Sequence, residues 1–318
     1  MSNINLKEAA SFLNERDGFV VFTHANPDGD TIGSATALVL MLRSIGKKAA
    51  AVCADPIPAK LSFIKTENVF IKELPQHVET AISVDVASQA ILGSLGAFCD
   101  GRAFDLSIDH HKVNSVPCHR LLVMNNYISN GEIIYELALC MGIKLDINIA
   151  TALYGAICSD SGGFKYLNTR AETYEYAADM IRAGVDFVRI NKMLFDEKTP
   201  KQIALERMAY NTLSLHYDGK LAIVAVDEHT VEELCVTDSD FDVLNQIPRQ
   251  IMGVEVSAVL RPRNGGTKVS LRSNEYFDVA EFARQHGGGG HIHAAGYSFG
   301  SCVKDATEAL IKDLNGVF

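Results

Sequence analysis

The sequence predicts an α/β protein, with an N-terminal doubly wound parallel sheet and a smaller C-terminal α/β domain that has a mixed sheet. Short apolar runs alternate with helical patterns in the first half of the chain, which is typical of βαβ units. These runs lack a polar face, as expected for parallel strands covered by helices on both sides. We therefore expect a first domain at residues 1–190, a helical linker at 191–215 and a second domain at 216–318.

The first half shows four apolar runs of strand length and four stretches with apolar residues at helical spacing. Gly46 and Gly142 end two of these helical stretches, as expected for residues that follow a helix. The predicted strands cover residues 19–23, 49–53, 80–84 and 104–108, and the predicted helices cover residues 6–16, 31–45, 132–141 and 147–159.

The second half begins with a charged helical stretch at residues 171–214, which Pro200 interrupts. Strands then resume, and a run of four glycines at 287–290 precedes the last of them. The predicted strands cover residues 221–226, 254–260, 268–272 and the region near 297–299, and a helix at 304–314 follows.

The composition narrows the class of protein. The net charge of −10, from 29 basic and 39 acidic residues, argues against a protein that coats long nucleic acid through counterion release. A short phosphorylated substrate stays open, since a few local cations can bind one. The longest apolar stretch, at residues 35–42, is too short to span a membrane. The seven cysteines are scattered and form no Cys-x-x-Cys pair, so we expect reduced thiols and a cytoplasmic protein.

Acidic and histidine side chains follow several of the predicted elements at their carboxyl ends. In open α/β sheets, ligands bind outside the carboxyl ends of the strands. Carboxylates mixed with imidazoles suit Mn²⁺ or Mg²⁺ better than a metal that prefers thiolates. The candidate residues are His24, Asp28, Asp30, Asp85, Asp109, His110, His111 and Asp160.

The combination of these residues predicts a site for two metal ions. Each acid alone would pass for a turn residue or a helix cap, but their joint occurrence after separate strands favours metal binding. Two metals about 3.5–4 Å apart polarise a phosphoryl group and activate a bridging water. Such a pair needs a shared carboxylate, and Asp85 stands alone between the two clusters. Asp109 has a second interpretation, in which it orients a histidine by a hydrogen bond and does not itself bind a metal.

The motifs resemble those of the DHH phosphoesterase family, which is named for a triplet seen here at Asp109-His110-His111. The first motif matches residues 24–30 with Gly33-Ser34, the second Asp85, and the fourth 160–164. The C-terminal part resembles the associated DHHA1 domain, through residues 269–273 and 287–296. By length and motif set, the chain looks like the NrnA-like group of bifunctional oligoribonucleases and pAp phosphatases (pAp is 3′-phosphoadenosine-5′-phosphate).

The resemblance implies a role for each candidate residue. His24 and Asp28 would hold one metal, and Asp85 would be shared between both ions. A separate set would hold the other metal: Asp30, His110 and Asp160. His111 would contact the scissile phosphate or the leaving oxygen, so that His111 and Asp85 are the catalytic residues, and Asp109 would support the histidines. The family's usual metal is Mn²⁺, with Mg²⁺ or Co²⁺ as alternatives.

One local departure from the family is visible after the third motif. The helix there usually opens with a small hydroxyl residue before its glutamate, whereas Asn130 and Gly131 precede Glu132 in this chain. The departure concerns the helix cap and leaves the predicted metal ligands intact.

Four successive glycines near the C-terminus could present their backbone amides to an anion. A flexible turn would explain the run equally well by itself. With Arg272 upstream, which could bind a phosphate bidentately, and with the DHHA1 resemblance, we favour a site for the substrate's terminal phosphate. Its predicted residues are Arg272, Gly288, Gly289, Gly290 and His291. Phe164 and Tyr166 could stack on a base, although core packing explains Phe164 equally well.

The resemblance implies a Mn²⁺-dependent phosphoesterase with its substrate in a cleft between the domains. Expected substrates are short 5′-phosphorylated oligoribonucleotides such as pApA, which would yield mononucleotides, and pAp, which would yield AMP. Neither long nucleic acid nor a membrane is an expected partner, and a homodimer is compatible with the sequence.

Several alternative functions remain open. Within the enzyme class, the alternatives are a cyclic-dinucleotide phosphodiesterase and an exopolyphosphatase. An inorganic pyrophosphatase shares the first-domain motifs, but its second domain carries a Ser-Arg-Lys-type motif rather than this glycine run. A nucleotide sensor without activity is the alternative from another class, and it predicts damaged ligands where this chain retains all six.

Overall fold

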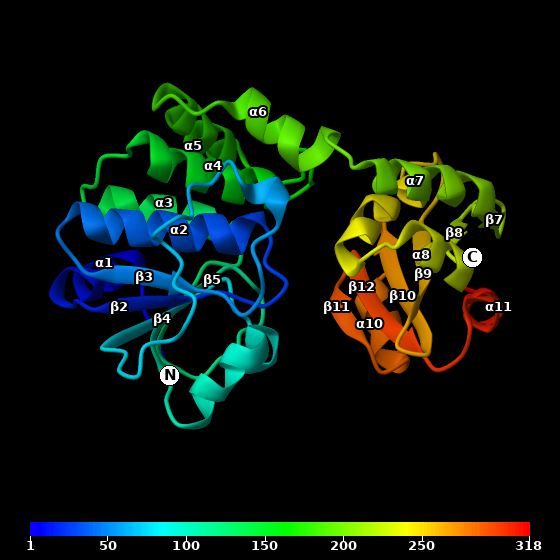
Figure 1. The fold of residues 1–318 in the computed structure, drawn as a ribbon, viewed down its shortest axis with the longest axis horizontal. Coiled ribbons are helices and arrows are strands. Elements are labelled where there is room, and N and C mark those ends of the chain that lie inside the picture. Colours follow the sequence, from blue (N-terminus) through cyan, green and yellow to red (C-terminus); the bar gives the residue numbers. More distant parts are fainter. The chain divides into compact units, whose positions relative to one another are not determined.

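The computed structural model describes the backbone of residues 1–318 and every side chain except those of residues 238, 239, 242 and 291. The chain divides into two compact units, Met1–Glu197 and Lys198–Phe318, which we describe one at a time (Figure 1). The stretch expected as a linker falls into both units. The helical segments α6 (Phe187–Asn191) and η3 (Lys192–Asp196) belong to the first, and α7 (Pro200–Thr212) belongs to the second.

The first unit contains a six-stranded, fully parallel sheet, which confirms the predicted α/β class. Its strands lie in the order β1-β6-β5-β4-β2-β3. Their bounds are Ser2–Asn3 for β1, Phe19–Phe22 for β2, Ala49–Val52 for β3, Thr80–Val84 for β4, Phe104–Asp109 for β5 and Cys118–Val123 for β6.

The strand order reverses at β2. The chain passes from β2 to β3 on one side, and then crosses to β4 on the other side of β2 before it continues outward to β5 and β6. The carboxyl ends of β2 and β4 therefore flank a topological switch point, where ligands bind in open α/β sheets. Residues that follow these strands are placed at that point by topology alone.

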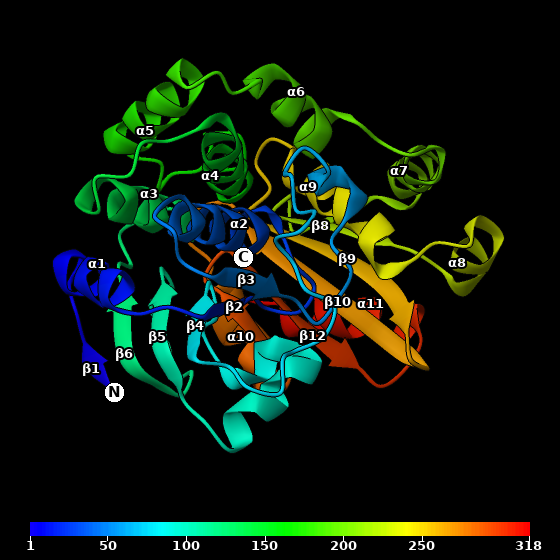
Figure 2. The ribbon, with the colours of Figure 1, turned by 60° about the vertical axis from the view of Figure 1, so that its left-hand side comes forward.

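Four α-helices lie on one side of this sheet, in more than one layer, and pack with it into a single large core (Figure 2). The innermost is α2, which is buried along most of its length because the sheet lies on one side of it and α4 on the other. The opposite face carries a second apolar cluster beneath the 3-10 helical segment η2, Gln89–Asp100. The four helices are α1 (Leu6–Glu15), α2 (Gly29–Ser44), α3 (Asn130–Cys140) and α4 (Ile147–Asp160), and α5 (Ala171–Arg182) packs on α4.

The second unit contains a mixed six-stranded sheet, as predicted. Its strands lie in the order β11-β12-β10-β9-β8-β7, and only the pair β8–β9 is parallel. Helices α10 (Val279–Gln285) and α11 (Val303–Asp313) pack on one face, and α7 packs on the other face over β8 and β9. The strands are β7 (Ser214–His216), β8 (Leu221–Ala225), β9 (Val256–Arg263), β10 (Gly266–Ser273), β11 (Gly289–His291) and β12 (Ala294–Phe299).

Several elements were not expected from the sequence. These are the strands β1, β6, β7 and β11, the helices α8 (Glu228–Leu234), α9 (Gln246–Arg249) and α10, and the 3-10 segments η1 (Ala59–Leu61), η2 and η4 (Asp238–Asn245). Most are short or carry polar residues within the element, as β6 does with His119 and Arg120. Among the described residues, no helix combines the length and apolar character that a membrane crossing requires.

Candidate metal centre and active site

The predicted ligands meet at the carboxyl ends of β2, β4 and β5. They form three overlapping triads, and within each triad one ligand atom per residue lies within 4.8 Å of the other two. The triads are His24 with Asp28 and Asp85, Asp30 with His110 and Asp160, and Asp85 with His110 and His111. Residues as far apart as His24 and Asp160 therefore converge on one place.

Asp85 lies between the two main groups. It directly follows β4, its backbone adopts a left-handed conformation (φ 57°), and its side chain is almost fully buried. One carboxylate oxygen, Oδ2, lies 3.4 Å from Nε2 of His24, and the other, Oδ1, lies 3.5 Å from Nε2 of His110. Because its two oxygens face different histidines, the Asp85 carboxylate can serve both sides of the site.

Backbone carbonyl groups orient two of the histidines. Nδ1 of His24 lies 2.8 Å from the Ala25 carbonyl oxygen, and Nδ1 of His110 lies 3.4 Å from that of Tyr127. A carbonyl oxygen can only accept a hydrogen bond, so in both rings Nδ1 carries the proton. Nε2 then faces the carboxylates and is the nitrogen through which each imidazole would bind a metal.

Asp109 lies behind the histidines and belongs to none of the triads. Its Oδ1 accepts from Nδ1 of His111 at 2.8 Å and from the backbone N–H of His110 at 2.9 Å. Its Oδ2 accepts from the Asn114 side chain at 2.7 Å. With its oxygens occupied in this way, Asp109 fixes the orientation of His111, in agreement with the supporting role that the sequence suggested.

The two acids of the first motif have different surroundings. Asp28 caps α2, where it accepts from the Thr31 N–H at 3.0 Å, and its side chain is half exposed. Asp30 is fully buried and is held by the backbone N–H groups of Asn130 (2.6 Å) and Gly131 (2.9 Å). The Ser34 hydroxyl also donates to Asp30 at 3.0 Å.

The crowding of carboxylates shifts the pKa values of the site. Burial, and then the negative charge of Asp85, raise the pKa of Asp30 to about 8. Burial and the neighbouring aspartates also raise the pKa of Asp160 well above its usual range. Burial by itself would lower the pKa of His24, but hydrogen bonds with Asp28 and Asp85 raise it to about 11. The site therefore favours extra positive charge, held as protons in the absence of a cation.

The residues of this site fit divalent cations. The donors are carboxylate oxygens and imidazole nitrogens, which suit Mn²⁺ and Mg²⁺, and none of the three triads contains a thiolate. Oδ1 of Asp85 is buried and has no hydrogen-bond partner among the described residues. A cation between the histidine and carboxylate groups would satisfy this oxygen and offset the repulsion between the acids.

Two of the predicted substrate residues of the second unit, Arg272 and His291, lie in one row across its sheet. Arg272 on β10 pairs with Ala294 on β12, and Ala294 pairs in turn with His291 on β11. Directly paired residues project to the same side of a sheet. On β10 this side carries the partly exposed Lys268, Ser270 and Arg272, while the alternate residues enter the core. The side chain of His291 lies outside the described residues.

The glycine run differs from the predicted row of four available amides. The N–H groups of Gly287 and Gly288 donate to the carbonyl oxygens of Arg284 and Ala283, and so close the end of α10. Gly289 and Gly290 begin the edge strand β11. A Cβ at Gly288 would lie 2.2 Å from the Gly296 oxygen, and one at Gly290 would lie 2.4 Å from the Ala294 oxygen. Gly288 and Gly290 are therefore needed for close backbone packing, whereas a Cβ at Gly287 or Gly289 would meet no atom within 4 Å.

The aromatic residues of the fourth motif also have distinct positions. Phe164 packs between Tyr154 and Tyr174, with ring centroids 5.7 and 5.5 Å apart, so the packing interpretation describes it. Tyr166 is partly exposed and lies against Gly162, two residues beyond Asp160. Of the two, Tyr166 is the more exposed.

Sequence reasoning missed the backbone groups that hold the ligands. These are the N–H groups of Asn130 and Gly131 and the carbonyl groups of Ala25 and Tyr127. Backbone groups carry no residue-specific signal, so no motif could have revealed them. The only available hint was the start of the helix at Asn130, where free N–H groups are expected to attract a carboxylate.

Comparison with known proteins defines the class of this one. The description "DHH family, N-terminal domain" matches residues 18–157, and "DHHA1 domain" matches residues 215–318. With the fold and the cluster of acids and histidines, these matches define a hydrolase that acts on phosphoester bonds. The chain belongs to the DHH family and carries a DHHA1 domain in its second unit.

Individual relatives agree with this assignment. A Thermus thermophilus protein, "Bifunctional oligoribonuclease and PAP phosphatase NrnA", is 31% identical over 87% of this chain and 82% of its own length. A Streptococcus mutans protein, "Probable manganese-dependent inorganic pyrophosphatase", is 30% identical over 52% of this chain and 56% of its own. The structure of an exopolyphosphatase-related protein from Bacteroides fragilis superposes with a TM-score of 0.91 at 21% identity. That superposition covers 98% of this chain and 95% of the other, and it shows a shared fold.

Proposed function

We propose that this protein is a Mn²⁺-dependent phosphoesterase that hydrolyses short 5′-phosphorylated oligoribonucleotides to mononucleotides and removes the 3′-phosphate of pAp. The observation that carries the metal part of this proposal is the position of Asp85, whose two oxygens face histidines of different ligand groups. The relative named for both activities, which aligns with most of this chain, supports the substrate part.

Two divalent ions would supply an activated water and stabilise negative charge on the phosphoryl oxygens. His24, Asp28 and Asp85 would hold one ion, and Asp30, His110, Asp160 and Asp85 the other. Two of the three triads of ligand atoms support this division, and the third, which groups Asp85 with His110 and His111, supports the second position of Asp85 beside His110.

His111 has the geometry of a residue that acts on the substrate. Its Nδ1 is hydrogen-bonded to Asp109 at 2.8 Å. Burial by itself would lower the pKa of the ring, but this hydrogen bond and the negative charges of Asp109 and Asp85 raise it above its usual value. A ring held in this way can donate from Nε2 to the scissile phosphate or to the leaving oxygen. Asp109 would keep the ring in the correct orientation during that step.

Substrate binding by the second unit is proposed from the exposed side of its sheet. Arg272, and Lys268 on the same strand, give that side a positive charge suited to a phosphate. The residues paired with β10 there, Ala294 and Gly296, have small side chains or none. We propose that Arg272 binds the terminal phosphate, with Gly289, Gly290 and His291 beside it.

The pyrophosphatase similarity favours a second candidate substrate, inorganic pyrophosphate, since that relative aligns with about half of this chain. A parallel assay of pApA, pAp and pyrophosphate, with Mn²⁺ present, separates the two functions. We expect turnover of the two nucleotides and little or none of pyrophosphate. The reverse preference would establish a pyrophosphatase, and nucleotide binding without any turnover would establish a sensor.

A further inference from the structure

A fully buried glutamate lies next to the metal centre without belonging to it. Glu132, in the first turn of α3, accepts hydrogen bonds from the Ile128 N–H (3.0 Å), the Thr173 hydroxyl and the Arg170 guanidinium (3.1 Å). A buried charge is tolerated only when it is paired and hydrogen-bonded, as this one is. This network of hydrogen bonds therefore fixes the position of the backbone segments that contact it.

One part of the backbone fixed by Glu132 is the start of α3. The same turn of helix provides the N–H groups of Asn130 and Gly131 that hold both oxygens of Asp30. A displacement of this helix end would move the donors, and the buried Asp30 would lose its orientation. Glu132 is thus connected to one ligand of the Asp30–His110–Asp160 triad.

The other part is the segment that leads into the helix. Glu132 holds the Ile128 N–H, while the Arg170 guanidinium lies 4.3 Å from the ring centroid of Tyr127. The Tyr127 carbonyl in turn accepts from Nδ1 of His110. Glu132 and Arg170 together therefore fix the carbonyl group that orients a second ligand of the same triad.

We propose that Glu132 and Arg170 are positioning residues for one of the two metal sites. They present Asp30 and His110 to a cation, while the other site depends on different contacts. His24 is oriented by the Ala25 carbonyl and Asp28 by the Thr31 N–H, and neither residue contacts α3 or α5 in any described hydrogen bond. The proposal rests on the metal centre of the proposed function and does not depend on which phosphoester is cleaved.

Calorimetric titration of the metal-free full chain with Mn²⁺, in the absence of substrate, tests this proposal. In Glu132→Gln an amide N–H₂ group replaces one acceptor and faces donors, and Arg170 loses its buried charged partner and keeps only the more exposed Glu172. We expect the affinity of one Mn²⁺ binding step to fall about 10–100-fold, which is the usual effect of mutating residues that support metal ligands. The affinity of the other step should stay unchanged. Activity should recover with excess Mn²⁺, with the KM for substrate unaltered.

Arg170→Lys is the second variant, because it keeps a cation beside Glu132 and so preserves the buried pair. It loses the planar contact with Tyr127, and we expect a smaller loss of affinity at the same binding step. This variant tests the proposal if Glu132→Gln does not fold.

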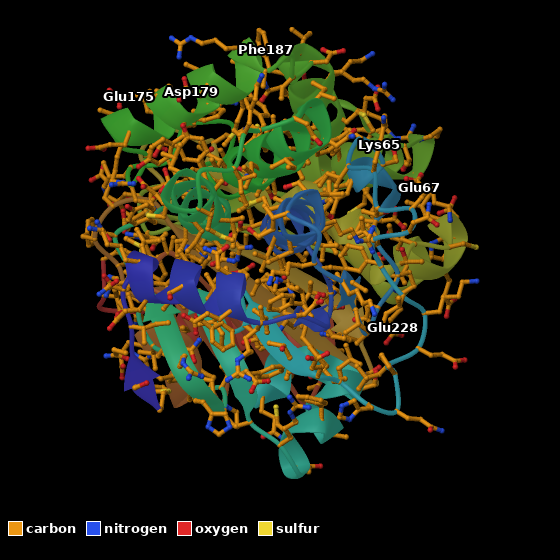
Figure 3. The ribbon with its side chains drawn as sticks, turned by 90° about the vertical axis from the view of Figure 1, so that its left-hand side faces the viewer. Lys65, Glu67, Glu175, Asp179, Phe187 and Glu228 are labelled. Atoms are coloured by element: carbon orange, nitrogen blue, oxygen red, sulfur yellow. The ribbon has the colours of Figure 1, made fainter. Side chains whose placement is uncertain are left out.

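Tyr135→Phe is the matched control. Tyr135 lies on α3 and donates to Asp179 on α5 at 2.6 Å, so the substitution removes another link between the same helices, one that involves neither Glu132 nor Arg170. Figure 3 labels Asp179 on the outer helix α5. Equal weakening of Mn²⁺ binding in this control, or unchanged binding in both folded test variants, would overturn the proposal. Normal metal binding without hydrolysis in the wild-type protein would count against the proposed function alone.

Discussion

At the scale of single residues, the site depends on how each donor is turned. His24 and His110 each give Nδ1 to a backbone carbonyl and keep Nε2 for the site, and Asp85 divides its two oxygens between them. The residue types were readable from the sequence, but these orientations were not. They depend on backbone groups such as that of Tyr127, which lies 17 residues from His110.

Asp85→Asn should reduce hydrolysis of every substrate by at least about 100-fold, because it removes the charge of a carboxylate that faces both ligand groups. Mutation of residues that only support the ligands of a metal site already reduces activity by about 10–100-fold. Steady-state rates at saturating Mn²⁺ measure this, and circular dichroism verifies folding. A folded variant within threefold of the wild-type rate would contradict the shared role of Asp85.

Arg272→Ala should raise the KM for pApA by about 10–100-fold and change kcat little, because a charged hydrogen bond contributes about 1.5–3 kcal/mol and the contact is shared by ground and transition states. Arg284→Ala, at an exposed arginine of α10 in the same unit, is the control and should leave both constants unchanged. A loss confined to kcat would exclude Arg272 as an anchor.

At the scale of elements, the site requires α2 to lie very close to α4. Asp28 and Asp30 begin α2, and Asp160 ends α4, so the crossing of these helices sets the distance between their carboxylates. The crossing is close because small residues line it. A Cβ at Gly33 would lie 2.4 Å from the Ala152 oxygen.

Gly33→Ala should therefore destabilise the protein by about 1–3 kcal/mol, the usual effect of inserting a methyl group into a packed interior. Chemical denaturation monitored by circular dichroism measures the change. Gly101→Ala is the control, because a Cβ there meets no atom within 4 Å, and it should change stability little. Equal stability of the two variants would show that the helix crossing relaxes freely.

At the scale of the whole molecule, the two units have separate cores, and the predicted metal ligands all belong to the first. Crowded carboxylates within that unit favour a bound cation, as the raised pKa values of Asp30 and Asp160 indicate. Metal binding and the folding of the first unit should consequently be linked.

Mn²⁺ at 100 times its dissociation constant should stabilise the first unit by about 2.7 kcal/mol for each ion that binds, relative to the chelated protein. Hydrogen exchange of the full chain should slow around β4 and β5 and change little in β10 and β12. Asp160→Asn should reduce this Mn²⁺ effect while leaving the metal-free protein at least as stable, because its carboxyl group is held among other acids. Equal protection of wild type and variant by Mn²⁺ would exclude Asp160 as a ligand.

The sequence by itself determined the α/β class, the parallel first sheet and the mixed second one, and the family. Continuous apolar runs such as β4, whose bounds were predicted without error, identify themselves because burial on both faces leaves no polar residue within the strand. It also supplied the metal-ligand types, since carboxylates and imidazoles at strand ends are unusual in combination. Short or polar elements such as β6 and β11 gave too little pattern to be predicted.

Only the tertiary structure decided which groups hold those ligands in place. The Asn130 and Gly131 amides reach Asp30 across about one hundred residues of sequence, and two glycine amides predicted to bind an anion instead close a helix. Hydrogen bonds of the backbone are common to all residues, so their partners follow from how the chain packs and from no property of the side chains at those positions.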